Sequence, residues 1–463
     1  MKEKKSEAPR RGNEELFKWD GNPTFGQILP LAAQHVLAAV VGCVTPAILV
    51  ANAANNAGGN VNMGLLIQMS LVFAALSTFL QLYGNKIHLG SGLPVIIGVS
   101  FAYVPTMTAI AAQAQDVNTI FGAMIVGGIV AIIVGLTIKQ IRKVFPPLVI
   151  GTVIFAIGLS LYKTAINYMA GNSANTYEVI VEQRGQTAAL VYGSWQNWLV
   201  AVITLIIVTF LNHYGKGIWK LASILIGIIG GYIVSLCFGM IDFSSVSNAS
   251  FFQLPKPMHF GITFEPSSCV AIAILFAINA VQAIGDFSAT TTGAMDRMPT
   301  DKELTGGIVG YGISNIISAF FGGLPTATYS QNVGIVSTTK VTSRRVMGTA
   351  AVILLAAGLI PKFSSLLTTI PYCVLGGATI SVFASIAMTG MKLIASEELN
   401  FRNTTIVGLA IAVGMGVTQA SASLAQFPDW VTTIFGKSPV VLATISAIVL
   451  NLILPKQLDP KTK

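Results

Sequence analysis

Apolar segments, each separated from the next by a short polar stretch, follow one another along nearly the whole chain. A transmembrane helix needs about 20 consecutive apolar residues, within a range of roughly 17–25. After a charged tail at residues 1–24, segments of about this length occur at residues 27–50, 64–84, 87–110, 118–138, 144–163, 195–212, 219–240, 265–290, 303–321, 325–340, 345–361, 368–390, 402–418 and 437–455. The pattern predicts an all-α polytopic membrane protein with fourteen membrane-spanning segments.

The third and tenth of these segments are interrupted by glycine and proline. In the tenth, the GGLP sequence at 322–325 would break a helix in its first turn, and residues 326–329 favour a short extended piece. Two side-chain amides, those of Gln331 and Asn332, follow. Irregular backbone at membrane depth is tolerated only where it is buried in protein or lines a cavity. The tenth segment is therefore predicted to form a ligand site.

The two interruptions share a tripeptide. GLP occurs at 92–94 and again at 323–325, 231 residues later, and the same offset pairs Ser100 with Gln331. Seven segments separate the two tripeptides, and because seven is odd, the two halves must enter the membrane from opposite faces. Broken segments at corresponding positions of an inverted repeat are the best sequence indication of a transporter's binding site.

Composition and charge agree with a chain embedded in a lipid bilayer. The chain is 53% hydrophobic and 10% charged, whereas soluble domains carry about 25% charged residues. With the N-terminus inside, 22 of the 27 Lys and Arg residues fall inside and 5 outside, as the positive-inside rule expects. We therefore predict a multi-pass protein of the cell membrane with both termini cytoplasmic and the first span retained. The net charge of +9 is explained by these loops, and no nucleic acid partner is predicted.

Only a few polar or ionisable side chains within the apolar segments are candidates for binding a ligand. Asp286 is the one acidic residue well inside a segment, and ionisable groups at such positions are functional hypotheses, although a structural pair or helix cap is the alternative. Gln282 precedes it by one helical turn on the same face. Together with Gln331 and Asn332 they form a predicted polar cluster whose donors and acceptors suit a planar heterocycle with carbonyls and ring N–H groups.

Two further residues have competing interpretations. His35, early in the first segment, would either bind ligand or be a satisfied interhelical histidine. Phe101 would either stack on an aromatic ligand or face lipid. The four cysteines show no CxxC or Cys/His spacing, so neither a metal nor a disulfide is predicted. No Ser/His/Asp set or cofactor loop appears, so the sequence does not favour an enzyme.

Several of these motifs together resemble the nucleobase–ascorbate transporter family. The motif that carries most weight is Gln331-Asn332-Val333-Gly334 followed by Thr339-Lys340, which matches the family signature of Gln or Glu, Asn, any residue, Gly, four residues, Thr and a basic residue. The supporting matches are Gln34-His35, Gly92-Leu93-Pro94 with Ser100-Phe101, and Ile284-Gly285-Asp286. They spread from residue 34 to residue 345.

The resemblance implies a fold and an assembly. It implies fourteen spans in a 7+7 inverted repeat, with short antiparallel strands in broken spans 3 and 10 that meet at the substrate. A core of residues 25–140 (spans 1–4) and 263–362 (spans 8–11) would move against a gate of residues 141–262 (spans 5–7) and 363–463 (spans 12–14 and tail). Family members are driven by protons or, in some animals, by sodium. A homodimer through the gate spans is also implied.

The resemblance assigns roles residue by residue. Gln331 would bind the base, and Gln rather than Glu there tilts the expected substrate from uracil to xanthine or urate. Phe101 would stack on the ring and Ser100 would line the pocket. His35 would support the site from span 1, and Asp286 would be a core carboxylate of span 8.

This chain departs from the family at two carboxylates. The family usually has Glu where Gln282 stands, and Asp before Gly in span 9, where this chain reads Gly310-Tyr311-Gly312. Gln282 keeps its hydrogen-bonding capacity but does not titrate, so Asp286 would have to carry any cation coupling. The expected function is a purine permease, for xanthine or urate, that works by alternating access without a cofactor. The alternatives are a carrier for uracil or another base, an uncoupled facilitator, and an anion exchanger or channel on a related fold.

Overall fold

The computed structural model describes residues 14–137, 146–428, 431–436 and 438–455. Residues 1–13 of the predicted tail and the predicted domain boundary at 140–141 lie outside this part of the chain. Within it, nine helices are long and apolar enough to cross a membrane, or ten if one bent pair counts as a single span. The protein is therefore a mostly helical, multi-pass membrane protein, as predicted.

Helices occupy most of the predicted segments. They are α1 (Phe25–Asn56), α2 (Met63–Tyr83), α3 (Val104–Ala114), α4 (Asn118–Leu136), α6 (Pro147–Met169), α7 (Trp195–Tyr214), α8 (Ile218–Leu221), α9 (Ser223–Cys237), α10 (Ser244–Asn248), α11 (Pro266–Met295), α12 (Asp301–Phe321), α13 (Ser330–Thr339), α14 (Arg344–Gly358), α15 (Pro361–Thr368), α16 (Tyr372–Ala395), α17 (Phe401–Gln419) and α19 (Pro439–Ile453). Helix α14 ends at Gly358, and α15, which is bent from it by 76°, begins at Pro361, the position where a helix accepts proline best.

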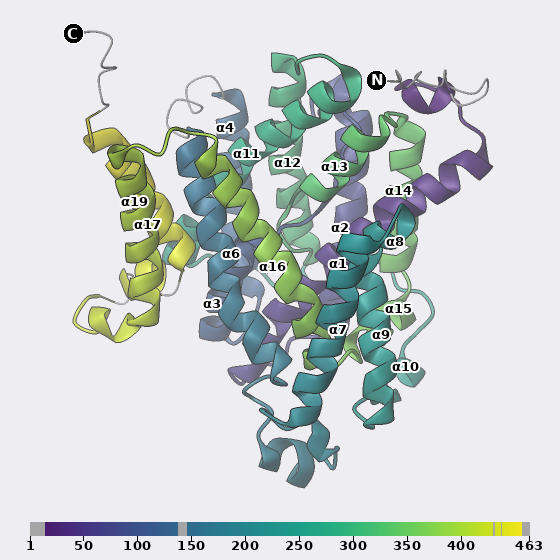
Figure 1. The fold of residues 1–463 in the computed structure, drawn as a ribbon, viewed down its shortest axis with the longest axis vertical. Helices are drawn as coiled ribbons and strands as arrows, with labels where there is room; N and C mark the ends of the chain where they lie inside the picture. Colours follow the sequence, from purple (N-terminus) through teal and green to yellow (C-terminus); the bar gives the residue numbers. More distant parts are fainter. Residues whose placement is uncertain (1–13, 138–145, 429–430, 437, 456–463) are drawn as a thin grey trace, which may run out of the picture.

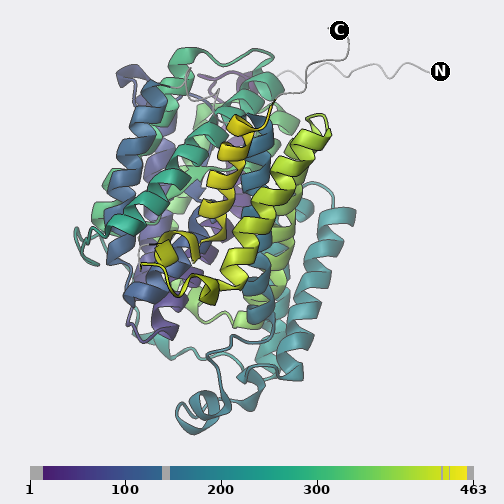
Figure 2. The same cartoon turned by 90° about the vertical axis from the view of Figure 1, so that its left-hand side faces the viewer.

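The helices gather into two groups. In one group, α4 packs on α11 and α12, and α2 packs on α14, while α1 lies against α2, α3 and α14. In the other, α6 packs on α16, α7 packs on α9 and α16, and the pair α17 and α19 lies on the outside of α6 (Figure 2). The start of the described chain and the end of α19 lie at one end of the molecule, here called the terminal face (Figure 1). The segment between α6 and α7 lies at the other end, the opposite face.

Both interrupted segments contain a strand, and the two strands pair. Strand β1 (Ile97–Val99) runs antiparallel to β2 (Thr326–Thr328), with Ile97 opposite Thr328 and Val99 opposite Thr326. Two more backbone bonds extend the ladder, from Ser100 N to Pro325 O and from Tyr329 N to Ile96 O, each 3.1 Å. The segments that are distant in sequence therefore meet in the middle of the first helix group.

Each strand has one edge that is not paired with the other strand, and one side chain forms hydrogen bonds to backbone groups on that edge. Thr78 of α2 accepts a bond from Ile97 N at 3.0 Å through its Oγ1. Asn315 of α12 accepts from Thr326 N at 2.7 Å through Oδ1 and donates to Thr326 O at 3.2 Å through Nδ2. Because an unpaired edge would be costly inside a membrane, these two side chains allow a two-stranded sheet to exist there.

The strands correct one detail of the sequence alignment. The GLP tripeptides align the halves with an offset of 231 residues, but the strand ends Val99 and Thr328 are separated by 229 residues, the difference 328 − 99. The reason is that β1 begins three residues after Pro94, whereas β2 begins one residue after Pro325. The first segment therefore has two more residues between its proline and its strand than the second segment has.

Candidate functional site

A cavity of about 260 Å³ lies beside the strand pair, between the two helix groups. The first group contributes side chains from the ends of both strands, from α11 and from the start of α13, and the second contributes α6 and α16 (Figure 1). The residues around it are Ser100, Phe101, Ala102, Ile154, Ile157, Gln282, Thr328, Tyr329, Ser330, Gln331, Ser385, Ile386 and Thr389. Both apolar surface and hydrogen-bonding groups are thus available to one small ligand.

Gln331 stands in the first turn of α13, directly after β2. Its side chain is exposed to the cavity, as is that of Ser330. The first bond of the helix runs from Val333 N to Tyr329 O at 3.0 Å, so the N–H groups of residues 330–332 precede the helical ladder. The positive end of the helix dipole and the Gln331 amide therefore lie at the same wall of the cavity.

Helix α11 supplies a second amide to the cavity. Gln282 lines it from a half-buried position. One turn earlier, buried Asn279 accepts a bond from Ser100 Oγ at 3.3 Å through Oδ1 and donates to Leu275 O at 3.0 Å. Ser100 in turn accepts from Ala102 N at 3.3 Å, so that it caps the short turn Phe101–Tyr103 after β1. Asn279 thus fixes the strand end that presents Phe101.

Phe101 lines the cavity and has an aromatic neighbour. Its ring lies edge-on to Phe383 of α16, with centroids 5.6 Å apart and an angle of 74° between the ring planes. The contact joins the two helix groups beside the cavity and holds Phe101 from one side. A flat ligand would meet the ring in the cavity, which is the arrangement that stacking requires.

Asp286 is separated from the cavity by two hydroxyls. Its carboxylate is 8% exposed and accepts bonds from Thr328 and from Ser330 Oγ, the latter at 2.8 Å. Both hydroxyl residues line the cavity, whereas Asp286 does not. The predicted polar cluster is therefore divided into an exposed pair of amides and a carboxylate behind them.

His35 and Asn332 also lie behind the cavity wall. Asn332 is fully buried and donates through Nδ2 to His35 Nδ1 at 3.0 Å and to His35 O at 3.1 Å. An imidazole that accepts this bond at Nδ1 carries its proton on Nε2 when it is neutral. The pair joins α1 to α13 and fixes the helix that carries Gln331. The structure therefore brings the two predicted residues together, but neither lines the cavity.

Tyr311 occupies the position where the family pattern has a carboxylate. Its hydroxyl bonds the hydroxyl of Tyr103, and both side chains are buried against Phe276. The ring centroids of Tyr103 and Phe276 are 5.0 Å apart, and those of Phe276 and Tyr311 are 5.5 Å apart. A neutral aromatic cluster thus connects the third segment to α11 and α12.

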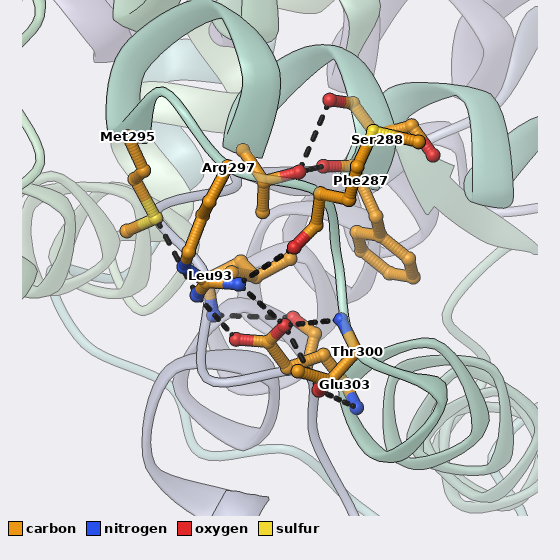
Figure 3. Close-up of polar contacts among 10 residues, drawn as sticks. Leu93, Phe287, Ser288, Met295, Arg297, Thr300 and Glu303 are labelled. Atoms are coloured by element: carbon orange, nitrogen blue, oxygen red, sulfur yellow. Dashed lines mark hydrogen bonds and ion pairs between the residues drawn. The ribbon is translucent and has the colours of Figure 1, made fainter.

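The turn between α11 and α12 is held by ionic contacts at the terminal face. Arg297 donates to both oxygens of Glu303, at 2.9 Å and 2.5 Å, and Glu303 also accepts from Thr300 N at 2.8 Å (Figure 3). Figure 3 also shows Leu93 of the first broken segment beside this turn. The bidentate pair fixes the junction between the helix that carries Gln282 and the helix that carries Asn315.

The two faces of the molecule differ around the cavity. On α16, Ser385 and Thr389 line the cavity from the half nearer the terminal face, and both are exposed. Toward the opposite face, Asn52 of α1 donates to Tyr168 of α6 at 3.1 Å and accepts from the Tyr372 hydroxyl of α16 at 2.9 Å. Side chains of both helix groups thus meet between the cavity and the opposite face.

Sequence reasoning missed several cavity residues. Thr328 and Ser330 were visible within the broken segment but carried no separate signal. Asn279 lies three residues before Gln282, and that spacing places both on one helical face, so the polar stripe of α11 would have identified it. Ser385 and Thr389 come from the second helix group, and only the tertiary structure places them opposite the amides. No group of three or more possible metal ligands occurs among the residues that were placed.

Comparison with known proteins identifies the family. A model described as the permease family matches residues 26–423. The uric acid permease PucJ of Bacillus subtilis is 33% identical over 429 residues, covering 92% of this chain and 92% of that protein. The xanthine permease XanQ of Escherichia coli K12 is 30% identical over 463 residues, covering 97% and 96%. These are names of transporters and not of enzymes.

Two solved structures share the fold. The transmembrane domain of a cyanobacterial bicarbonate transporter, BicA, aligns with a TM-score of 0.57 at 19% identity, over 90% of this chain and 97% of that one. The murine anion transporter Slc26a9 in its inward-facing state aligns with a TM-score of 0.62 at 12% identity, over 98% and 73%. The matched model and the relatives, which span nearly the whole chain, show that this chain belongs to the permease family, that is, to the nucleobase–ascorbate transporter family.

Proposed function

We propose that the protein is a membrane permease for purine bases, with xanthine or urate as substrate. The observation that carries the proposal is the cavity in which the side-chain amides of Gln282 and Gln331 and the ring of Phe101 surround one space of about 260 Å³. The names of the relatives, uric acid permease and xanthine permease, support the same substrate class.

The chemistry of the cavity suits an oxidised purine. Such a base presents carbonyl oxygens and ring N–H groups around a flat ring. Each glutamine amide offers two N–H donors and one acceptor, so the two amides satisfy both kinds of group. The N–H groups at the start of α13 favour a carbonyl oxygen or a delocalised negative charge beside Gln331.

We further propose fourteen spans in a 7+7 inverted repeat, and the contacts of the broken segments support this. Each strand is held by the preceding span of its own half, β1 by Thr78 and β2 by Asn315. Each broken segment is also bonded by the first span of the other half. Ser100 bonds Asn279 of α11, and α1 provides the corresponding contact in the other half, between His35 and Asn332. These contacts correspond in the two halves, as an inverted repeat requires.

Transport would proceed by motion of a core, residues 25–140 and 263–362, against a gate, residues 141–262 and 363–463. Gln282, Gln331 and Phe101 belong to the core, whereas Ser385 and Thr389 belong to the gate. Rigid-body motion of the core would therefore carry the amides past the gate surface. With both termini cytoplasmic, the exposed side of the cavity would open to the cytoplasm.

Cation coupling, by proton or sodium, would depend on Asp286. An ionised carboxylate accepts from both Thr328 and Ser330, whereas a protonated one must donate to one of them and turn that hydroxyl toward the cavity. The charge state of Asp286 would thus change the orientation of a hydroxyl group that lines the cavity. Asp286→Asn keeps the hydrogen bonds, so it should retain binding while the response of uptake to a pH or sodium gradient is lost. Gradient-driven accumulation by that variant would exclude this role.

Uptake into proteoliposomes tests the function directly. Labelled xanthine should enter vesicles that contain the protein, with and without an imposed pH or sodium gradient, and unlabelled urate should compete better than uracil. Uptake of neither xanthine nor urate under any of these conditions would exclude the proposal. If uracil competed better than urate, the protein would still be a base carrier, but its substrate would be uracil. Uptake that responds to neither gradient would indicate an uncoupled facilitator.

An anion exchanger is the candidate of another class, because BicA and Slc26a9 share the fold. Among the residues that the structure describes, those around the central cavity include neither Lys nor Arg, and a site for a small hydrated anion would favour such groups. A homodimer through the gate helices is a further part of the proposal. Large apolar side chains of α7, among them Ile206 and Phe210, are exposed and available for lipid or a second copy.

A further inference from the structure

A second cavity lies at the opposite face, between the two helix groups. Its volume is about 330 Å³, somewhat larger than the 260 Å³ of the central cavity. Its walls come from the end of α1, the segment between α6 and α7, the segment after α9, and the start of α16. Within the described part of the chain, this outer cavity and the central one have no wall residue in common.

Polar groups of both charges surround the outer cavity. Arg184, Gln186 and Asn175 contribute a guanidinium and two amides from the segment between α6 and α7. Asp242 contributes a carboxylate, and hydrogen bonds from the backbone N–H and the hydroxyl of Ser244 hold its pKa below the usual value. Asp242 is therefore ionised at neutral pH. One cation, one anion and two amides offer donors and acceptors without a net charge.

The floor of the outer cavity is a set of three side chains that bridges the helix groups. Asn52 of α1 is 3% exposed, and its amide donates to Tyr168 and accepts from Tyr372. The two tyrosine rings lie edge to face with centroids 5.0 Å apart. Both Asn52 and Tyr372 also line the outer cavity. Tyr168 lies eleven residues beyond Ile157, a wall residue of the central cavity, which is about 16 Å along a helix.

Opening of the central site toward the opposite face requires these bonds to break. Asn52 belongs to one moving body and the two tyrosines to the other, so relative motion separates them. A buried amide left without partners is unfavourable, because it has lost its bonds to water and gained none in the protein. A ligand that presented one acceptor and one donor to Asn52 would replace both tyrosine hydroxyls and offset that cost.

From this arrangement we infer that the outer cavity is a second binding site for an oxidised purine base, where the base is held before Asn52 releases the two tyrosines. The ring carbonyls meet Arg184 and the amide N–H groups, and the ring N–H groups meet Asp242 and the amide oxygens. The inference rests on the proposed function for the class of ligand. It adds a site, an order of events and a role for Asn52 that the central cavity does not require.

Equilibrium binding of labelled xanthine to the full-length protein in lipid nanodiscs tests the second site. Gln331→Ala, which removes the main amide of the central site, should leave a weaker saturable component. Adding Arg184→Gln to Gln331→Ala should weaken that component about tenfold or more, because a hydrogen bond to a charged group is worth about 1.5–3 kcal/mol. Lys256→Gln, at another exposed cation of the predicted outer loops, is the matched control and should leave it unchanged.

The outcomes separate the inference from the proposed function. Absence of purine binding and uptake by the unmodified protein would exclude the function and, with it, this site. If the unmodified protein transports xanthine but Gln331→Ala abolishes all saturable binding, the outer site is excluded and the function stands. A residual component that Arg184→Gln leaves unchanged would also exclude it.

Chemical protection gives a second, independent readout. Cys237 is exposed, so Cys237→Ser is introduced first, and Gln186→Cys then places one thiol in the outer cavity. In the Gln331→Ala background, added xanthine should slow labelling of this thiol by a membrane-impermeant maleimide by about the fraction of sites occupied. Labelling that xanthine does not slow at concentrations that saturate the residual binding component would overturn the inference.

Discussion

The broken segment of the first half, residues 92–114, and that of the second half, residues 323–339, reach the same sheet but present different groups to the cavity. After β1, Ser100 caps a short turn and the chain presents the apolar ring of Phe101 before α3 begins. After β2, α13 begins at once and presents the hydroxyl of Ser330 and the amide of Gln331. One segment therefore offers a face for a ring and the other offers hydrogen bonds.

The same two segments are supported with unequal strength. On the β2 side, Asn315 makes bonds to both the N–H and the C=O of Thr326. On the β1 side, Thr78 offers a single hydroxyl, which accepts from Ile97 N at 3.0 Å and whose one proton is shared between the carbonyls of Ala74, at 2.8 Å, and Ile97, at 3.3 Å. The segment that carries the amides is held more firmly. Hydrogen bonds to a ligand need tighter positioning than stacking does. The firmer support of the second segment therefore agrees with its offering hydrogen bonds, whereas the first segment offers a ring face.

One aromatic side chain fills the space that glycine leaves between β1 and α1. Tyr329, from the second segment, donates to Val99 O of the first at 2.7 Å. A Cβ placed on Gly98 would lie 2.5 Å from Tyr329 Cζ, and one placed on Gly42 of α1 would lie 2.8 Å from its hydroxyl oxygen. The close approach of the two segments therefore depends on glycine at both positions.

The largest effect is expected at the amide itself. Gln331→Ala should lower the efficiency of xanthine uptake by about 30- to 150-fold, because two lost hydrogen bonds in a desolvated site are together worth about 2–3 kcal/mol. Uptake per unit of protein in proteoliposomes measures this. Gln419→Ala, at an exposed glutamine that ends α17, is the control. Near-normal transport by Gln331→Ala would mean that the site has been placed wrongly.

The next largest effect is expected where the second strand is held. Asn315→Ala leaves the N–H and C=O of Thr326 without their side-chain partner, so the free energy of unfolding should fall by about 2–3 kcal/mol. Thermal unfolding of the detergent-solubilised protein measures the change. Asn248→Ala, on the exposed helix α10, should have little effect. Equal midpoints for the two variants would contradict the assigned role of Asn315.

A smaller loss is expected from crowding between the strands. Gly98→Ala pushes a methyl group into Tyr329 and should cost about 1–3 kcal/mol of stability, with a parallel fall in uptake because β1 and β2 separate. Gly408→Ala, on an exposed turn of α17 where a Cβ meets no atom within 4 Å, is the matched control and should be neutral or slightly stabilising. A Gly98→Ala protein with normal stability and uptake would show that the strand contact is not required.

Much of this site was predictable from the sequence, and the reasons for the misses are physical. The interruptions predicted an extended piece at 326–329, where the structure has β2 at 326–328. The ligand site stays a prediction, and four of its predicted residues, Gln282, Gln331, Phe101 and Ser100, line one cavity. Sequence spacing along a helix does not reveal depth. The sequence therefore placed Asp286, Asn332 and His35 in the same site as the amides, although these three residues are buried behind the cavity wall. The shift of two residues between the halves required the strands themselves.

The smallest expected effect distinguishes the two strand supports. Thr78→Val keeps the shape of the side chain but removes the acceptor for Ile97 N, so stability should fall by about 1–2 kcal/mol, less than for Asn315→Ala. Thr405→Val is the matched control, because Thr405 Oγ1 makes the same kind of bond to a carbonyl four residues earlier, at 2.7 Å, without supporting a strand. Thermal unfolding compares the three variants. If Thr78→Val were as harmful as Asn315→Ala, the two segments would be equally dependent on their neighbours, and the firmer support of the amide-bearing segment would have to be abandoned.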